Sequence, residues 1–471
     1  MNILMIGNGF DLAHGLPTKY KDFLEFGKKL SAIYSETNIL SPESYQKDYL
    51  NGWKMDEKIK RYLQDLFIGR EECKETEGNT SRFKTGNPNM DEFYELIKDN
   101  CWFDYFDQCN MKGRDNWIDF ESEISNVIQK IDSDMKGKSF NGQVDNLLIN
   151  YLNDHCLNKR YKMDKCMEEN GSNEISYREQ RDLLLRNLNR LIRALEIYLY
   201  EITERIDYKR ISPDIKSIMT YDFEYVDKTT IKKITKVLNF NYTSTYERIY
   251  FSCLEKSKEN IDKSDVDYID YIHGKADIKH TVENSNIVLG IDEYLPDDRK
   301  DKNIEFIAFK KFYQRIYKGT GCKYKEWINE IKSNYESGKE GYENSMELMM
   351  NALKNDDMEQ LLKWSKASGV NYKGMKKKYD LYIFGHSLDV TDKDILREWI
   401  LNDNVHTTIF YHKNSNEEGY DDNGRADLGA KIANLVKIIG QDELIRRTGG
   451  STKTIEFKLQ QDMVDASVMT E

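Results

Sequence analysis

Two glycines near the start of the chain, Gly7 and Gly9, are the first residues whose type and spacing suggest ligand chemistry. They follow the apolar run "MNILMI", which has the length and apolar content of a buried parallel strand. Because glycine has no side chain, the chain can turn sharply there and a ligand can approach the main chain. Helical spacing of apolar residues resumes in "KYKDFLEFGKKL". A strand, a glycine turn and a helix in this order predict a nucleotide-binding α/β domain.

The dinucleotide-binding fingerprint G-x-G-x-x-G is only partly present in this segment. Gly7 and Gly9 match its first two glycines, but Leu12 stands where the third would be. The acidic residue that binds the ribose in that fingerprint is also not evident. A tight turn between a strand and a helix, with no ligand, therefore remains an alternative.

Polar and glycine residues also follow other short apolar runs, which include "KVLNFNYT", "DYIDYIHG", "NIVLGI" and "DLYIFGHSL". In an open parallel sheet, ligands bind outside the carboxyl ends of the strands, so these residues should collect around one pocket. Each has an ordinary explanation, such as a helix cap or a turn, but together they favour a shared site. The predicted pocket walls are Gly7-Asn8-Gly9, Asn241-Tyr242-Thr243, His273-Gly274, Gly290-Ile291-Asp292 and Gly385-His386-Ser387.

The elements that must position these residues divide the chain into parts. After about residue 231, short apolar runs alternate with helical patterns, which predicts a parallel sheet with helices on both faces. The helical patterns lie at 246–256, 301–317, 343–365, 391–402 and 425–447, and a long amphipathic helix is predicted at about 178–206. We expect residues 1–35 and 231–460 to form one Rossmann-like α/β domain, 36–230 a mainly helical insertion, and 461–471 a flexible tail.

The composition of the 471 residues limits the class of protein. A hydrophobic content of 39% with 32% charged residues indicates a folded globular chain. The net charge of −12 disfavours binding to nucleic acid or to an anionic membrane, because either usually requires a basic face. The seven cysteines form no C-x-x-C pair and the first residues lack a charged leader, so we expect a cytoplasmic protein with free thiols. The apolar segment 183–202 is interrupted by arginines and glutamates, which indicates a packed helix and no membrane span.

Six segments of the chain resemble the bacterial AbiH family of phage abortive-infection proteins. They occur in the family's order and span residues 2 to about 446. More distantly, the succession G-x-G, N-Y, H-G and G-x-S-L-x-D resembles the SIR2-like domains of antiphage systems, some of which hydrolyse NAD. The resemblance implies a Rossmann-like (SIR2-like) fold with an inserted helical region. The segments are "IGNGFDLAHGLPTKYKDFL", "NWIDFE", "NFNYT", "IHGK", "VLGID" and "FGHSLDVTDKDIL".

The resemblance also implies roles for these motifs, with NAD as the substrate. Backbone amides of the first turn would cradle the pyrophosphate. Asp11 would either cap local amides or bind a ribose hydroxyl. The residues expected to bind the nucleotide are Gly7, Asn8, Gly9, Phe10, Asp11, Glu121, Tyr242, Gly290, Asp292, Gly385, His386 and Ser387.

The two catalytic residues implied by the resemblance are Asn241 and His273. Asn241 would match the asparagine that positions water and ribose in SIR2-like domains. Thr243 stands where that motif usually has aspartate, which leaves the role of position 243 open. His273 would match the catalytic histidine, whose imidazole can accept a proton from a ribose hydroxyl or from water near neutral pH.

Two of the motifs have structural explanations as well. In "GHSLDVTDKDIL", Ser387 can turn toward a ligand, while Thr391-x-x-Asp394 resembles a capping box for the next helix. In "NWIDFESEI", Trp117, Phe120 and Ile124 share one helix face, and Asp119 and Glu123 share another. Glu121 either points into the pocket or belongs to a solvated acidic face.

We therefore expect an antiphage abortive-infection protein that acts as an NAD glycohydrolase and depletes NAD on infection. One alternative is a metal-dependent nuclease, with Asp119, Glu121, Asp292 and Glu293 as ligands, although the scattered cysteines and histidines predict no metal. Another is a nucleotide-binding sensor without turnover. An NAD-consuming enzyme must be inactive in healthy cells, so we expect homo-oligomer packing or the inserted helices to restrain it until a phage-derived trigger appears.

Overall fold

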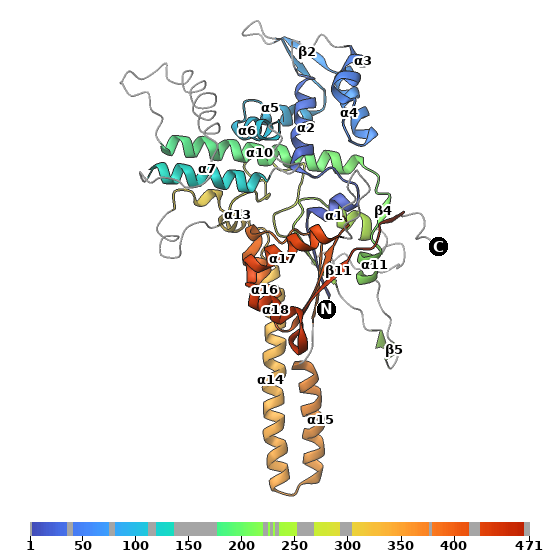
Figure 1. The fold of residues 1–471 in the computed structure, drawn as a ribbon, viewed down its shortest axis with the longest axis vertical. Helices are drawn as coiled ribbons and strands as arrows, with labels where there is room; N and C mark the ends of the chain where they lie inside the picture. Colours follow the sequence, from blue (N-terminus) through green and yellow to red (C-terminus); the bar gives the residue numbers. More distant parts are fainter. Residues whose placement is uncertain are drawn as a thin grey trace.

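The computed structural model describes most of the chain, with gaps between its segments. The described residues are 2–34, 41–74, 81–111, 119–135, 177–219, 225–226, 229–230, 235–251, 268–292, 304–375, 379–413 and 424–465. A central sheet carries a layer of helices beyond one end of its strands, and a long helical hairpin projects from the opposite side of the molecule (Figure 1). Within the described ranges, every helix is too short or too polar to serve as a membrane span.

The central sheet has six strands, all parallel, in the spatial order β11-β10-β9-β1-β7-β8. Numbered along the chain, this is the order 3-2-1-4-5-6 of the dinucleotide-binding Rossmann fold, read from the other edge. The predicted Rossmann-like α/β class is therefore confirmed. The strands are β1 (Asn2–Ile6), β7 (Thr235–Asn239), β8 (Ile269–Tyr271), β9 (Tyr379–Phe384), β10 (Val405–Tyr411) and β11 (Ile455–Leu459).

The direction of the strand order reverses between β1 and β9. Ile6 at the end of β1 is in register with Asn239 at the end of β7 and with Phe384 at the end of β9. Three strands thus end at one level, where their chains leave on opposite sides. In open α/β sheets, ligands bind in the crevice at such a switch point.

Two expectations about strands were wrong. The run "NIVLGI" at 286–291 forms no strand of the sheet, although Ile287, Val288 and Leu289 are buried. Its backbone groups find partners elsewhere: Val288 N donates to His273 O, and Leu289 N donates to the side chain of Gln314. Conversely, the structure contains a strand, β11, that was not predicted. Its run "IEFKL" is short and polar at every second residue.

The residues of β1 alternate between two cores. Ile3 and Met5 pack on one face with α14, α16 and α17, whereas Leu4 and Ile6 pack on the other with α1 and α11. Helices therefore cover both faces of the sheet, as expected for parallel strands. These helices are α1 (Asn8–Ala13), α11 (Pro213–Met219), α14 (Tyr324–Lys354), α16 (Lys393–Ile400), α17 (Arg425–Ile439) and α18 (Gln441–Thr448).

A separate helical layer lies beyond the carboxyl ends of the strands (Figure 1). Its longest helix, α10 (Tyr177–Arg205), corresponds to the helix predicted at 178–206. The helix α2 (Tyr20–Ser31) packs here, so the chain enters this layer after the short helix α1. The other helices are α3 (Pro42–Ser44), α4 (Glu57–Ile68), α5 (Pro88–Ile97), α6 (Cys101–Met111), α7 (Phe120–Met135) and α13 (Lys311–Lys318).

Three short strand pairs complete the described structure. The pair formed by β12 and β4 brings residues 464–465, near the C-terminus, against residues 210–211. The pairs are β2 (Glu71–Lys74) with β3 (Ser81–Lys84), β4 (Arg210–Ile211) with β12 (Val464–Asp465), and β5 (Tyr225–Val226) with β6 (Thr229–Thr230).

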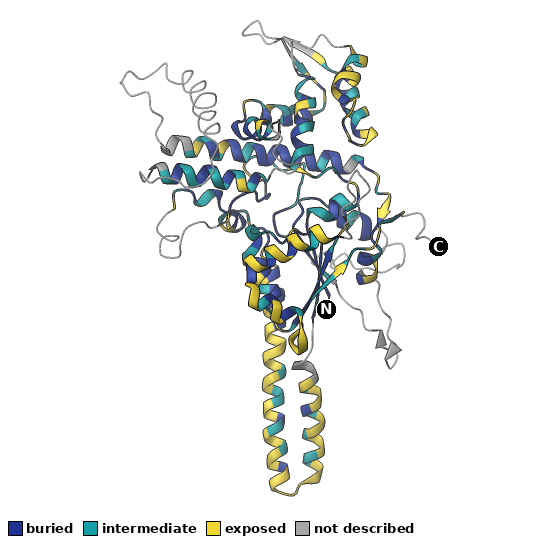
Figure 2. Cartoon of the chain, in the orientation of Figure 1, coloured by how far each residue is buried: buried dark blue, intermediate teal, exposed yellow. Residues whose placement is uncertain are grey.

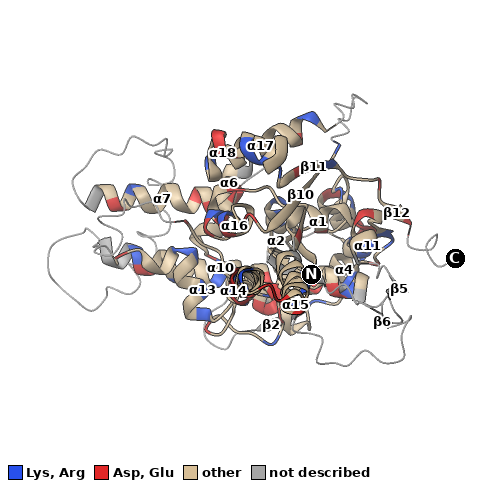
Figure 3. Cartoon of the chain, turned by 90° about the horizontal axis from the view of Figure 1, so that it is seen from below, with Lys and Arg blue, Asp and Glu red and all other residues tan. Residues whose placement is uncertain are grey.

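The single helical stretch predicted at 343–365 is instead the distal part of a hairpin. Its helices, α14 and α15 (Met358–Met375), run antiparallel and are mostly exposed (Figure 2). The turn between them places Asp356 in the left-handed region, at φ +55°. Figure 3 shows acidic and basic residues interspersed along the helices.

Candidate functional site

A cavity of about 300 Å³ opens at the carboxyl ends of β1, β7 and β9. Its floor is formed by the turns after these strands, and its roof by the start of α2, the start of α7, and Leu195 and Leu199 of α10. The aromatic rings of Tyr20 and Phe120 stack at a centroid distance of 4.0 Å, which joins α2 to α7 at this roof. The site thus lies between the sheet and the helical layer.

Gly7 and Gly9 must be glycines because the turn after β9 packs directly against them. Gly9 N donates a hydrogen bond to Gly385 O at 2.7 Å. A Cβ atom on Gly7 would lie 2.7 Å from the Cα of His386, and one on Gly9 would lie 2.8 Å from the Cα of Gly385. Gly385 itself has φ +67°, a conformation that favours glycine. The two turns therefore interlock at the switch point, and their backbones still line the cavity.

Asp11 is buried in the cavity wall, with 1% of its surface exposed. Its Oδ2 accepts a hydrogen bond of 2.6 Å from the Thr243 hydroxyl, which itself accepts one from Thr245. Oδ1 of Asp11 has no hydrogen-bond partner. Burial raises the pKa of this carboxyl to about 7, and the Thr243 hydroxyl only partly opposes that rise. Thr243, the position whose role the sequence left open, thus binds the aspartate of α1.

Asn241 and Tyr242 line the cavity directly after β7. The backbone N of Asn241 donates to the side chain of Asn239 at 2.8 Å, which fixes the start of this turn. The Asn241 side chain is 5% exposed, and its Nδ2 has no hydrogen-bond partner. Tyr242 instead donates from its hydroxyl to Val288 O at 3.0 Å. Of these two side chains, that of Asn241 also acts on Asp11, whose pKa it lowers.

Asp392 joins the two histidines predicted for the site. Its Oδ1 lies 3.2 Å from Nε2 of His273, and its Oδ2 lies 3.5 Å from Nε2 of His386. Nδ1 of His386 accepts a hydrogen bond from Leu388 N, so its proton resides on Nε2, facing Asp392. Leu388 adopts φ +59°, a strained conformation for a branched side chain, which aims this backbone N–H at the ring.

His273 is buried, and its Nδ1 has no hydrogen-bond partner. Burial lowers the pKa of this imidazole, and the positive charge of Lys311 lowers it further, while Asp392 partly counteracts both. With Nε2–H directed at Asp392, Nδ1 is an unprotonated acceptor on a residue that lines the cavity. The arrangement of carboxylate, imidazole and free ring nitrogen is the one that orients a general base.

Lys311 supplies a buried positive charge beside these groups. Its Nζ lies 2.7 Å from Oε2 of Glu121 and 3.2 Å from Oδ1 of Asp392. Although burial alone would lower it, Asp392 and Glu121 raise the pKa of Lys311 above its usual value. Burial would likewise raise the pKa of Asp392, but Lys311 and His273 hold it well below the usual range. Burial raises the pKa of Glu121 to about 7 despite Lys311. This lysine links the helical layer to the histidine pair.

Lys311 was missed by sequence reasoning because its helix is inverted. In α13, the inward face consists of Lys311, Gln314 and Arg315, whereas Ile316 and Tyr317 are 72% and 75% exposed. An amphipathic pattern predicts the opposite orientation, with the apolar residues inside. Asp392 was missed because it lies among three aspartates of the last motif, and nothing in the sequence distinguishes it from Asp389 or Asp394.

The segment Gly290 to Asp292 does not line the cavity, but it holds the segment that does. Ile291 forms an isolated parallel bridge with Lys310, and Lys311 N donates to Ile291 O at 2.9 Å. A Cβ on Gly290 would lie 2.4 Å from Phe309 O, so only glycine permits this approach. Asp292 is exposed. Residues 290–292, which were predicted to form a wall of the pocket, therefore position Lys311 and do not themselves line the cavity.

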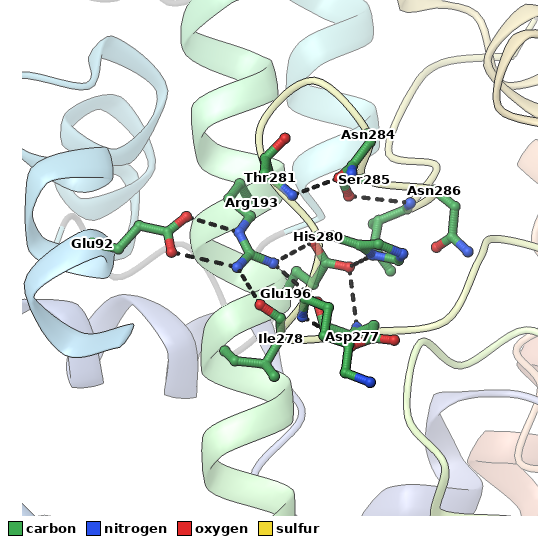
Figure 4. A network of polar contacts seen from close by, with 12 residues as sticks. Glu92, Arg193, Glu196, Asp277, Ile278, His280, Thr281, Asn284, Ser285 and Asn286 are labelled. Atoms are coloured by element: carbon green, nitrogen blue, oxygen red, sulfur yellow. Dashed lines mark hydrogen bonds and ion pairs between the residues drawn. The ribbon is translucent and has the colours of Figure 1, made fainter. Parts of the chain in front are cut away.

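The loop that follows His273 is anchored to α10 by a buried polar network (Figure 4). Arg193 donates to the backbone carbonyls of Asp277 and Ile278 at 3.1 and 3.0 Å, and pairs with Glu196 and Glu92. Glu196 in turn accepts from Asp277 N. Both Arg193 and Glu196 are buried within the layer. The helical layer thus fixes the loop that carries His273.

The remaining predicted residues have mixed positions. Asn8 lines the cavity and exchanges hydrogen bonds with Thr18, whereas Phe10 is buried in the core outside the cavity. Ser387 is an exposed residue of the cavity rim. Glu121 lines the cavity, which is one of the two positions predicted for it. Trp117 and Glu293 lie outside the described residues.

The predicted capping box in the last motif is also wrong in detail. The side chain of Asp389, not that of Thr391, caps the turn by accepting from Thr391 N at 2.9 Å. Asp394 instead pairs with Arg315 of α13. The motif therefore holds α13 next to the site, in addition to providing Asp392.

The strand order and this cavity define a Rossmann-like α/β protein with a cavity at the switch point of its sheet. A family model described as "Bacteriophage abortive infection AbiH" matches residues 3–412. Because the match covers most of the 471 residues, the chain belongs to this family, as its motifs predicted. Comparison with curated proteins and with solved structures gave no significant match.

Proposed function

We propose that this AbiH protein halts infected cells as an NAD glycohydrolase, with its active site in the cavity at the switch point. The observation that carries the proposal is the state of His273: a buried imidazole, held by Asp392, whose Nδ1 is unpartnered at the cavity wall. A neutral imidazole in this setting is suited to accept a proton. The family supplies the biological role, abortive infection, and the site supplies the chemistry.

The proposed reaction breaks the bond between C1′ of the ribose and the nicotinamide nitrogen. The ring leaves as neutral nicotinamide with the bonding electron pair, and the sugar acquires oxocarbenium character. A water oxygen then bonds to C1′ and its proton passes to Nδ1 of His273, directly or through a ribose hydroxyl. Asp392 stabilises the imidazolium that forms. Orientation of water and ribose by the free amide of Asn241 contributes the remaining geometry.

The size and charge of the site fit part of a dinucleotide. A volume of about 300 Å³ is at the lower end of the range for ligand pockets, so the cavity can enclose the reacting half of NAD. Lys19 and Lys21 of the cavity wall supply positive charge that would favour the anionic pyrophosphate. The rest of the ligand would extend from there toward the rim.

The nuclease alternative has less support from the same residues. Glu121 and Asp392 face each other across the ammonium group of Lys311, which occupies the space between them. Asp292 lies away from the cavity, and Asp119 caps the start of α7 by accepting from Glu121 N. A nucleotide sensor without turnover would use the same cavity and differs only in the outcome of an assay.

One assay separates the three functions. Purified protein is incubated in parallel with NAD, plasmid DNA and RNA, each with and without chelator. The proposal predicts release of nicotinamide from NAD in the presence of chelator, and none after His273→Ala. The matched control is His412→Ala, because that histidine is half-exposed, pairs with Asp427 and is not among the residues that line the cavity. Cleavage of nucleic acid that chelator abolishes would establish the nuclease, and binding of NAD without hydrolysis would establish the sensor.

A further inference from the structure

The seam between the two helices of the hairpin, α14 and α15, buries small residues. Ser345, Ala352 and Ser368 are buried in it. Asn371 of α15 donates a hydrogen bond of 3.0 Å to the Ser345 hydroxyl, and a Cβ on Gly341 would lie 3.0 Å from Nδ2 of the same asparagine. An amphipathic helix usually turns its large apolar side chains toward such a contact. Here the small residues bring the helices close together, and large apolar side chains face outward.

These large apolar side chains form one face of the hairpin. In each helix they recur at intervals of three, four, seven or ten residues, a spacing that keeps side chains on one side of a helix. The rings of Tyr342 in α14 and Tyr372 in α15 are in contact, with a centroid distance of 5.5 Å, so the two rows lie on the same side. We call this surface the apolar face; its residues are Tyr335, Tyr342, Met346, Met349 and Leu353 of α14, and Met358, Leu362 and Tyr372 of α15.

The apolar face is open to solvent in the single chain (Figure 2). Its members Tyr335, Leu353, Met358, Leu362 and Tyr372 are between 37% and 62% exposed. A contiguous apolar surface that is exposed to this degree marks an interaction site. Apolar rows with a repeat of three and four residues, on two antiparallel helices, correspond to half of a four-helix bundle. The other half must supply a similar pair of rows.

The size of the apolar face fits a dimer contact of modest strength. The shorter helix, α15, has 18 residues. At 1.5 Å per residue it is about 27 Å long, and two helices side by side are about 20 Å wide. Pairing two such faces removes about 1,000 Å² of surface from water, which is near the lower limit for a specific interface. The contact should therefore form reversibly.

The charges of the two helices favour a second copy of the hairpin as the partner. From Glu336 to Lys354, α14 has four glutamates and two lysines, whereas α15 has one glutamate and two lysines from Met358 to Tyr372. A copy related by a two-fold axis along the hairpin has its tip in the same direction and places each acidic α14 opposite the basic α15 of the other chain. A copy that runs in the opposite direction would place the two acidic helices together.

We propose that the apolar face binds the same face of a second copy of this chain, so that two hairpins form a four-helix bundle with their tips in the same direction. The hairpin projects from the side of the molecule opposite the helical layer that covers the cavity (Figure 1), so the contact leaves both cavities accessible. The dimer does not depend on which reaction the cavity performs.

Sedimentation of the full chain over a hundredfold range of concentration tests the dimer. The parent should be a dimer that dissociates on dilution. Leu353→Lys combined with Leu362→Lys should weaken the dimer about 100-fold, because each change places a charge in the centre of the contact. Both residues are exposed in the single chain, so the variant should fold. The matched control is Leu348→Lys with Val370→Lys, which are also exposed but lie outside the apolar face, and it should dimerise as the parent does.

Chemical cross-linking tests the direction of the two hairpins. Met358→Cys keeps a small apolar side chain on the apolar face next to the tip. A short bismaleimide should join two such chains into a covalent dimer above the background from Cys322 of the parent. In the opposite arrangement the two cysteines would lie about the length of the hairpin apart. A dimer without this cross-link would overturn the proposed direction. A parent that stays monomeric at every concentration, or a Leu353→Lys, Leu362→Lys variant as dimeric as the parent, would overturn the proposed contact itself.

Discussion

Nε2 of His273 and Oδ1 of Asp392 lie 3.2 Å apart, although 118 residues separate them in the chain. His273 follows β8 and Asp392 follows β9, and β1 and β7 lie between these two strands in the sheet. The segments that leave the carboxyl ends of the strands therefore bring the two residues together. The other oxygen of Asp392 lies 3.5 Å from Nε2 of His386, which belongs to the same segment after β9. This carboxylate orients the imidazole rings of both histidines, so the proposed chemistry depends on it.

Replacing Asp392 by asparagine should therefore impair turnover more than binding. The amide cannot stabilise an imidazolium, so nicotinamide release should fall by about 10²–10⁴-fold, the usual contribution of an acid–base group. The dissociation constant of ADP-ribose should change little. Steady-state kinetics and calorimetry on the same preparation give both values, and Asp403→Asn on the surface is the control. An equal loss in binding and turnover would mean that Asp392 only shapes the cavity.

Lys311→Met should destabilise the fold. It leaves Glu121 and Asp392 buried near one another without their common cation, and breaking a buried ion pair in this way typically costs about 3–5 kcal/mol. The midpoint of thermal unfolding should fall clearly below that of the parent. Adding Glu121→Gln to the variant should recover part of the loss, because it removes one of the unpaired charges. No recovery in the double variant would argue against a direct link through Lys311.

The glycines of the two interlocked turns should tolerate substitution less well than other glycines of the chain. A Cβ on Gly385 would lie 2.2 Å from Phe10 N, and the residue has positive φ, so Gly385→Ala should strongly destabilise the protein. Gly369 in α15 has nothing within 4 Å of a built Cβ, and Gly369→Ala should be neutral or stabilise by about 0.5–1 kcal/mol. Chemical denaturation of both variants checks the contrast. Equal stability of the two would mean that the strand turns are not interlocked as described.

Asp11 predicts a pH dependence of stability. Burial raises its pKa from 3.8 to about 7, so between these values the unfolded chain loses a proton that the folded protein keeps. The unfolding free energy of the parent, relative to Asp11→Asn, should therefore decrease from pH 4 to pH 7, by up to about 4 kcal/mol, and then level off. Denaturant titrations of both proteins across this range measure the difference. A difference that rises with pH would show that the carboxylate is stabilised in the fold.

The sequence predicted the parts of this site that depend on local pattern. The strand before Gly7, the helix after it and the turns at Asn241, His273 and Gly385 follow from apolar runs that end in glycine or polar residues. Lys311 could not be found in this way, because α13 turns its polar face inward and its burial is decided by Glu121 and Asp392. The strand expected at 286–291 does not form for a related reason. The side chain of Gln314, and not a neighbouring strand, accepts the hydrogen bond from the backbone there.

The most direct test of the central claim is the NAD content of infected cells. Cells that express the parent, His273→Ala or His412→Ala are infected with a phage against which the parent protects, and NAD is measured through the infection. The NAD content should fall in cells with the parent and with His412→Ala. In cells with His273→Ala, the protein should remain folded, but both the fall in NAD and the protection should be lost. Protection by the parent with unchanged NAD, or full protection and NAD loss with His273→Ala, would contradict this claim.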